Sequence, residues 1–230
     1  MSNTPGLRRP QVVAFDIIET TFDIEPLGEG LAGLGLPPGA HRRLYAETLR
    51  DAVSLACIGR FAPFMDVMVG ALAGMLAESG RTEPEVRLRS VLAVMRELPP
   101  HPDAAEAFAH LHQAGIRVFA LSNGAEAATR ALLNRAGMSG FVEAVLSVEM
   151  VGLAKPRAEV YRHAVATADV DAGQAMLAAC HPWDVTGAKA AGLAGGYVAR
   201  GKPYPATMIA PDLRADSLLD LATAITRLPA

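Results

Sequence analysis

The feature that most constrains the fold is a regular alternation of strand-like and helix-like segments from about residue 100 onward. Apolar runs rich in β-branched or aromatic residues lie at positions 12–15, 117–121, 142–148 and 175–179, with a weaker run at 196–199. Helix-like spacings of three and four between apolar residues occur over 103–114, 126–136, 158–166 and 185–191. This order predicts an α/β fold, with a parallel-sheet core and helices on both faces.

The segment between residues 26 and 98 follows a different pattern. Helical spacing of apolar residues covers 40–59, 62–79 and 83–98, a weaker example covers 26–36, and no strand pattern interrupts them. We therefore expect a helical cap domain over 25–98, inserted after the first strand of a core domain formed by 1–24 and 99–230. The stretch "PPHPD" at 99–103 predicts a return linker, in which Asp103 caps the next helix.

The composition narrows the class of protein. With 230 residues, 51% of them apolar, the chain can bury a substantial core. The net charge of −3 and the scattered basic residues argue against nucleic-acid and anionic-membrane partners and leave a small-molecule site. The segment "MSNTPGLRRP" lacks an apolar signal core and no later stretch is a membrane-span candidate, so we expect a cytoplasmic location. The two cysteines, Cys57 and Cys180, predict small buried apolar residues rather than a disulfide or metal site.

Polar residues follow four of the expected strands. Asp16 ends the first strand, Ser122 and Asn123 follow the second, Lys155 follows the third, and Asp184 lies just beyond the fourth. Because ligands bind at the carboxyl ends of parallel strands, these side chains should meet in one crevice.

Such a set is sufficient for covalent catalysis by a carboxylate. A strand-end aspartate is a competent nucleophile when a lysine keeps it ionised and backbone N–H groups bind developing negative charge. Asp184 has three open roles: positioning water, holding Lys155, or binding a divalent cation. Taken singly, a strand-end aspartate is usually a turn residue and a lone lysine is usually solvated. The triplet "SNG" at 122–124 also predicts a cap for the helix that begins near Glu126.

Four motifs in order resemble those of the haloacid dehalogenase superfamily, and of its L-2-haloacid dehalogenase (type II) branch in particular. They are "FDIIETTFD", "ALSNG", "VGLAKPRAEVY" and "HPWDVTGAKAAGL". The segment "LYAETLRDAVSLACIGRFAPF" resembles the first cap helices of that branch. The resemblance covers nearly the whole chain, and it implies a Rossmann-like core with a helical cap after the first strand.

The resemblance also implies roles for individual residues. Asp16 would displace halide from the α-carbon of a 2-haloacid, with Lys155 orienting it and Thr20 bonding to the nucleophile region. Tyr161 and Asp184 would support the lysine and the hydrolytic step, and Ser122 and Asn123 would contact the substrate carboxylate. The candidate substrate-contacting residues are Asn123, Tyr45, Phe64, Ile18, Tyr161, His181 and Trp183. In such enzymes water cleaves the ester without a metal ion.

Several residues depart from the branch pattern. Tyr45 stands where the halide-binding arginine is expected, and a phenol supplies no cation for a departing anion. Ala179 and His181 replace a serine and an asparagine of the hydrolytic apparatus, so His181 is either a base or an ordinary loop histidine. Ile18 stands where dehalogenases often have tyrosine.

Three functions follow from these residues. The first is a 2-haloacid dehalogenase-like hydrolase that acts on a small carboxylate substrate and needs no cofactor. The second is a phosphatase-like hydrolase of an activated phosphoryl compound, for which Mg²⁺ is possible; Ile18 opposes it, since superfamily phosphatases use a carboxyl there as a proton donor. The third is a catalytically decayed binding protein on the same scaffold.

The cap is expected to supply specificity. Tyr45 and Phe64 would line an apolar pocket above Asp16, while we expect Phe61 to pack among the cap helices. An apolar cap face would also permit a homodimer, as the family resemblance encourages.

Overall fold

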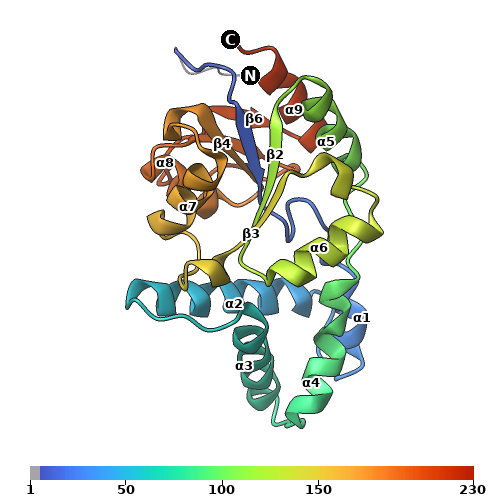
Figure 1. Cartoon of the computed structure of the whole chain (residues 1–230). Helices are drawn as coiled ribbons and strands as arrows, with labels where there is room; N and C mark the ends of the chain where they lie inside the picture. The colour runs from blue at the N-terminus through green and yellow to red at the C-terminus, as the bar shows by residue number, and fades with distance from the viewer. Residues whose placement is uncertain (1–5) are drawn as a thin grey trace.

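The computed structural model describes residues 6–230, which form a sheet of six parallel strands in the order β3-β2-β1-β4-β5-β6. The strands are β1 Val12–Phe15, β2 Arg117–Ser122, β3 Ala144–Ser147, β4 Ala175–Ala179, β5 Ala194–Val198 and β6 Leu213–Ala215. Since β1 lies between β2 and β4, the carboxyl ends of three strands meet near Asp16 (Figure 1). The predicted α/β parallel-sheet core is confirmed.

Helices cover both faces of the sheet, as predicted. Val13 and Phe15 of β1 pack in one apolar cluster with α5 Ala104–Gln113, α6 Glu126–Arg135 and α9 Leu218–Thr226. Val12 and Ala14 pack in a second cluster with α7 Ala158–Ala168 and α8 Pro182–Ala190, on the opposite face (Figure 1). Successive strand residues point to opposite faces, so a strand covered on both sides must be apolar throughout.

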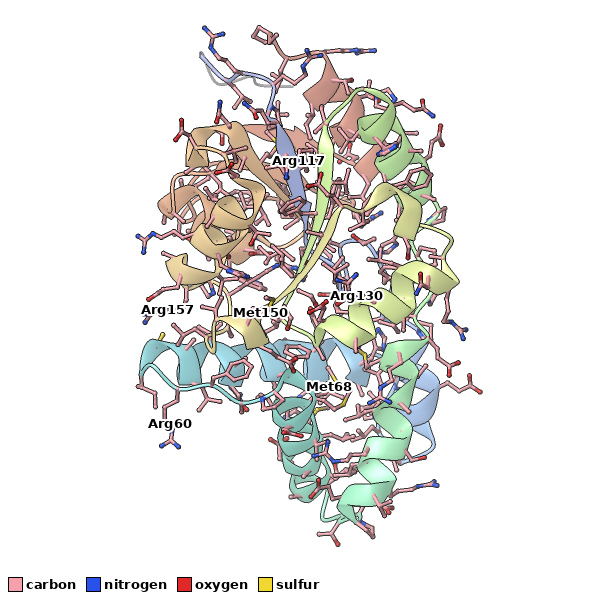
Figure 2. The ribbon with its side chains drawn as sticks, viewed as in Figure 1. Arg60, Met68, Arg117, Arg130, Met150 and Arg157 are labelled. Carbon is pink, nitrogen blue, oxygen red and sulfur yellow. The ribbon has the colours of Figure 1, made fainter. Side chains whose placement is uncertain are left out.

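The cap consists of helices that follow β1 and lie beyond the carboxyl edge of the sheet (Figure 1). They are α1 Leu27–Ala32, α2 Ala40–Cys57, α3 Phe64–Glu78 and α4 Glu85–Leu92, followed by the 3₁₀ turn η1 Ala93–Arg96. Met68 of α3 is fully buried inside the cap (Figure 2). The predicted helical cap is confirmed, whereas its boundaries at 25 and 98 and the homodimer stay predictions. Residues 1–5 of the predicted core domain lie outside the described residues.

Two elements at the end of the chain were not predicted, namely β6 and α9. β6 is only three residues long, too short for a periodic pattern. α9 did carry a signal, because Ser217 caps it by accepting a hydrogen bond from the Asp220 N–H, and its apolar residues are spaced as in a helix. Further 3₁₀ turns are η2 Ser139–Phe141, η3 Val148–Met150 and η4 Ala172–Gln174.

Three local predictions were wrong. Asp103 stands at the N-terminus of α5 but does not cap it; its carboxylate accepts from the Leu218 N–H at the start of α9. No side chain of "SNG" caps α6, because the Ser122 hydroxyl oxygen instead accepts from the Gly124 N–H. Cys57 is exposed at the end of α2, while Cys180 is buried as predicted. None of the described helices is both long and apolar enough to cross a membrane.

Candidate active site

A buried lysine joins two carboxylates at the carboxyl ends of β1 and β4. Lys155 Nζ lies 3.1 Å from Asp16 Oδ1 and 2.8 Å from Asp184 Oδ2. The side chains of Lys155 and Asp184 are 0% exposed and that of Asp16 is 7% exposed. Sheet topology brings the two carboxylates together, because β1 and β4 are neighbours, and Lys155 reaches both from the segment between β3 and α7.

The three charges shift one another's ionisation. Burial acts to lower the pKa of Lys155, but the Asp16 and Asp184 carboxylates outweigh it and raise the pKa above its ordinary value. Burial acts to raise the pKa of Asp16, yet the Lys155 ammonium and His181 hold that pKa below its usual range. For Asp184, burial prevails over the nearby ammonium and raises the pKa. Asp16 is therefore the ionised carboxylate suited to attack, and Asp184 is the more basic one, suited to accept a proton.

The second carboxylate oxygen of Asp16 has its own partners. Asp16 Oδ2 accepts a hydrogen bond from Thr20 Oγ1 at 2.6 Å and lies 3.0 Å from His181 Nδ1. Thr20 Oγ1 in turn accepts from the Cys180 N–H at 2.9 Å, which fixes the direction of the hydroxyl proton toward Asp16. The nucleophile candidate is thus held in one orientation on both oxygens.

Asp184 is fixed by a buried tyrosine as well as by the lysine. Tyr161 of α7 donates its hydroxyl to Asp184 Oδ1 at 2.5 Å, and the Tyr161 side chain is fully buried. Gly187 leaves room for this ring, since a Cβ at that position would lie 2.7 Å from the Tyr161 hydroxyl. Tyr161 therefore contacts Asp184, which in turn contacts Lys155. A contact between Tyr161 and the substrate stays a prediction.

His181, at the N-terminus of α8, lies between two carboxylates. Its Nδ1 is 3.0 Å from Asp16 Oδ2 and its Nε2 is 2.9 Å from Glu19 Oε2. The ring stacks on Trp183 at 5.3 Å between centroids, and the Tyr45 ring is 6.0 Å away. Two of the predicted aromatic contacts, Trp183 and Tyr45, therefore flank a histidine.

The ionisation of His181 follows from its neighbours. Burial acts to lower the pKa of His181, but Cys180 and the Asp16 and Glu19 carboxylates outweigh it, so the pKa lies well above its ordinary value. A histidine in that state cannot accept a proton, which argues against the role of base that the sequence left open.

Ser122 and Asn123 end β2 beside the lysine loop. Asn123 accepts the Lys155 backbone N–H through Oδ1 at 3.0 Å, so its carbonyl oxygen positions the lysine turn. Ser122 is 1% exposed, and its hydroxyl proton is free to donate, since the oxygen only accepts from Gly124.

A small cavity lies where the cap meets the core. Its volume is about 100 Å³, which corresponds to roughly three water molecules. Ile18, Phe64 and Ser122 are among its walls, with Met95 and Arg96 of η1 on the cap side. Asp16 does not line the cavity, but the walls include the residue two positions after it and the end of the neighbouring strand β2.

Neither Tyr45 nor Phe61 is among the residues that line this cavity. Tyr45 is 5% exposed and makes an edge contact with Phe64 at 6.0 Å between ring centroids. Phe61 packs against the apolar cluster of the core that includes α7 and α8, rather than among the cap helices alone.

The side chains that contact the Asp16 carboxylate oxygens are a hydroxyl, an imidazole and an ammonium. Asp16 Oδ2 is already occupied by Thr20 and His181, and a hard cation prefers oxygen ligands to a neighbouring imidazolium. Within residues 6–230, no three His, Cys, Asp or Glu side chains gather in a way that could hold a metal ion.

Two residues of the site were missed from the sequence. Glu19 contacts His181, and its signal was a carboxylate inside the first motif, three positions after Asp16. Arg96 lines the cavity from the cap, and an arginine at the end of an amphipathic helix gives no sign of that position.

The chain is similar to known hydrolases. The model of the haloacid dehalogenase-like hydrolase family matches residues 10–192. A curated (S)-2-haloacid dehalogenase of Xanthobacter autotrophicus is 29% identical over 197 residues, which cover 83% of this chain and 75% of that protein. A phosphoglycolate phosphatase of Cupriavidus necator is 32% identical over 127 residues, which cover 55% of this chain and 54% of that protein.

One solved structure matches almost the whole fold. The L-2-haloacid dehalogenase of Xanthobacter autotrophicus, with chloropropionic acid covalently bound, superposes with a TM-score of 0.86 at 25% identity. The match covers 95% of this chain and 99% of that one. With its core, its cap and the four motifs, the chain belongs to the haloacid dehalogenase-like hydrolases.

Proposed function

We propose that this hydrolase acts on a 2-haloacid or a similar small carboxylate, with Asp16 displacing halide. The observation that carries the proposal is the buried Asp16 carboxylate, which Lys155 holds ionised beside a cavity of about 100 Å³. The (S)-2-haloacid dehalogenase of Xanthobacter autotrophicus and the structure with covalently bound chloropropionic acid support it.

The first step is a displacement at carbon. An Asp16 carboxylate oxygen attacks the α-carbon of the substrate, the carbon–halogen bond breaks, and halide leaves with the bonding electron pair. A halide leaves as a stable anion and needs no proton, so Ile18 in place of an acid is no obstacle. In this proposal the Ser122 hydroxyl binds the substrate carboxylate, and Ile18 and Phe64, which line the same cavity, exclude water from the apolar part.

The second step releases the product by hydrolysis of the aspartyl ester. Burial raises the pKa of Asp184, which makes it a stronger base, and Asp184 shares the Lys155 ammonium with Asp16. We propose that no metal ion takes part, because Lys155 and His181 already supply cations at the carboxylate. Addition of a chelator should therefore leave turnover unchanged.

A halide-release assay tests the proposal. Wild-type protein should release halide from L-2-chloropropionate or its bromo analogue, and Asp16→Asn should release none. During turnover in ¹⁸O water, mass spectrometry should find label in the Asp16 peptide, because water attacks the ester at the aspartyl carbon. A substrate panel that yields no halide from folded wild-type protein would refute the dehalogenase assignment and leave the family assignment intact.

A second candidate function is a phosphatase-like hydrolysis, and the phosphoglycolate phosphatase of Cupriavidus necator is the observation in its favour. Ile18 opposes it, because losing a general acid costs roughly 10²–10⁴-fold in rate. Phosphate release from phosphoglycolate that rises with added Mg²⁺ would support this function, and release without any Mg²⁺ response would count against it.

A further inference from the structure

Both ring nitrogens of His181 face carboxylate oxygens. Nδ1 lies 3.0 Å from Asp16 Oδ2 and Nε2 lies 2.9 Å from Glu19 Oε2. A neutral imidazole has one donor and one acceptor, whereas ionised carboxylates only accept. Two such contacts at once therefore require the doubly protonated imidazolium.

Aromatic rings next to His181 favour the same charge state. The His181 ring is stacked on Trp183 at 5.3 Å between centroids, within the range at which a cation is attracted to an aromatic face. The ionisable groups that face His181 are Asp16, Glu19, Cys180 and Tyr45.

The backbone also holds Glu19 in place for this contact. Glu19 has a φ of 65°, a left-handed conformation that a non-glycine residue seldom adopts. Its N–H donates to the Phe22 carbonyl at 2.8 Å, and His101 Nε2 donates to the Glu19 carbonyl at 3.0 Å. An unusual conformation fixed on both sides is typical of a functional position.

The partners of Asp16 distinguish its two oxygens. Among the described residues 6–230, Oδ2 has Thr20 and His181 as donors, whereas Oδ1 has the Lys155 ammonium alone. A carboxylate oxygen offers about two lone-pair sites. Oδ1 therefore keeps one free site for attack on the substrate, and Oδ2 becomes the carbonyl oxygen of the ester.

We propose that His181, as an imidazolium, and Thr20 form the oxyanion hole for hydrolysis of the Asp16 ester. This role rests on the proposed function, because it requires the covalent ester. Two donors aimed at Oδ2 before the reaction begins stabilise the charge that develops on that atom. The L-2-haloacid dehalogenase branch that the chain resembles has a neutral asparagine at this position. In this chain His181 supplies a charged donor there.

Hydrolysis of the Asp16 ester proceeds in two stages. Water attacks Asp16 Cγ and gives one proton to Asp184, the carbonyl π electrons move to Oδ2, and His181 Nδ1–H and Thr20 Oγ1–H stabilise the oxyanion. The oxyanion then collapses, the Cγ–Oδ1 bond breaks, and the departing alkoxide takes the proton from Asp184. The product is a hydroxy acid, and the remaining Asp16 carboxyl loses its proton to solvent.

Rapid-quench kinetics can separate formation of the ester from its hydrolysis. His181→Ala should still release about one equivalent of halide per site in a burst, and the Asp16 ester should then accumulate. Its hydrolysis should slow by about 10²–10³-fold, as expected when an oxyanion donor is removed. His181→Asn, which keeps a neutral donor, should slow less. His112→Asn, at an exposed histidine lining a groove at the amino end of β2, is the matched control and should change neither step.

Nitrogen NMR of the wild-type imidazoles tests the charge state without turnover. At pH 7.5 both ring nitrogens of His181 should carry protons, and Glu19→Gln should lower the pH at which one of them is lost. These measurements use folded protein even where His181→Ala is unstable.

Two results would overturn the inference. A neutral His181 ring at pH 7.5 is one, and a halide burst followed by wild-type ester hydrolysis in folded His181→Ala is the other; both leave the proposed function in place. Wild-type protein that gives neither a burst nor an ester would instead remove the proposed function, and this role with it.

Discussion

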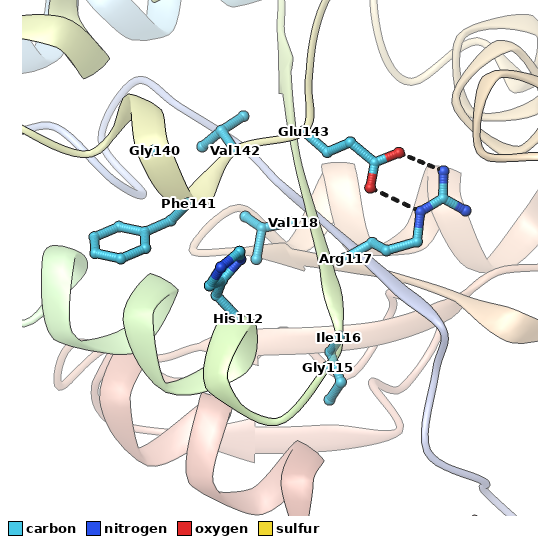
Figure 3. A pocket seen from close by; sticks show the side chains of 9 residues that line it. All are labelled: His112, Gly115, Ile116, Arg117, Val118, Gly140, Phe141, Val142 and Glu143. Carbon is cyan, nitrogen blue, oxygen red and sulfur yellow. Dashed lines mark hydrogen bonds and ion pairs between the residues drawn. The ribbon is translucent and has the colours of Figure 1, made fainter.

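Two ion pairs at opposite ends of the sheet use similar groups in different surroundings. At the amino end of β2, Arg117 contacts Glu143 through Nε–Oε2 at 2.9 Å and Nη2–Oε1 at 2.6 Å (Figure 3). Those side chains are 35% and 50% exposed. At the carboxyl end, Lys155 lies between Asp16 and Asp184 with a side chain that is 0% exposed.

The difference shows that burial, rather than pairing, creates reactivity. The hydrogen bond from Arg117 lowers the pKa of Glu143, but water reaches both groups and screens the pair. At the other end, burial and mutual charge push the pKa values of Asp16 and Asp184 in opposite directions. The cavity beside Arg117, about 360 Å³, is larger than the one beside Ser122, about 100 Å³, yet nothing around it is arranged as a nucleophile. Cavity size alone therefore does not identify the active site.

Breaking the buried cluster should have the largest effect. Lys155→Met leaves two buried carboxylates without a cation, which should lower the free energy of unfolding by about 3–5 kcal/mol. The pKa of Asp16 should then rise, because its ammonium partner is gone, and halide release should fall by at least about 10²–10³-fold. Urea unfolding at pH 7 and a halide electrode measure the two losses.

The pH dependence of the wild type provides a check on that explanation. The folded-state pKa of Asp16 lies below its unfolded value, because Lys155 and His181 outweigh burial. Its contribution to stability is therefore complete above about pH 4 and is lost as the pH falls further. Lys155→Met should lack most of this acid-sensitive contribution. Equal unfolding free energies for both proteins at pH 7 would contradict a role for the buried cation.

A smaller effect is expected from Tyr161→Phe, which keeps the ring and removes one donor to Asp184. The hydrogen bond from Tyr161 lowers the pKa of Asp184, so its loss should raise that pKa further. Ester hydrolysis, which needs ionised Asp184, should then decline at a higher pH than in the wild type. The loss of stability should be about 1.5–3 kcal/mol, as for a hydrogen bond to a charged group.

A pH profile of single-turnover ester hydrolysis measures the Tyr161→Phe shift. Tyr197→Phe is the matched control, because Tyr197 is another buried tyrosine, located on β5 and packed against Tyr204. An unchanged acid limb in Tyr161→Phe would mean that Asp184 is not the group whose ionisation controls hydrolysis.

The same comparison explains what the sequence could and could not predict. The parallel sheet and the meeting of Asp16, Lys155 and Asp184 follow from strand–helix alternation, because parallel strands place their carboxyl ends together. The strand order was not predicted. The contact of His181 with Glu19 did not follow, since it depends on a left-handed backbone at a glutamate, which residue type does not encode. Asp103 failed as a cap for a related reason: a folded chain offered it Leu218 N–H, a partner 115 residues away.

The smallest effect is expected at the exposed pair. Glu143→Gln removes the charge that pairs with Arg117 and leaves the bond from Arg117 to the Ala168 carbonyl in place. An exposed ion pair contributes about 0–1 kcal/mol, so the free energy of unfolding should change by no more than that. The loss in free energy of unfolding should be smaller still in high salt, because screening then weakens the pair in the wild type as well. Halide release should stay at the wild-type rate, since Arg117 lies at the end of β2 opposite Ser122. A loss above about 2 kcal/mol, or slower halide release, would show that the two ends of the sheet are energetically coupled. Surface screening alone would then not account for the difference between the exposed pair and the buried cluster.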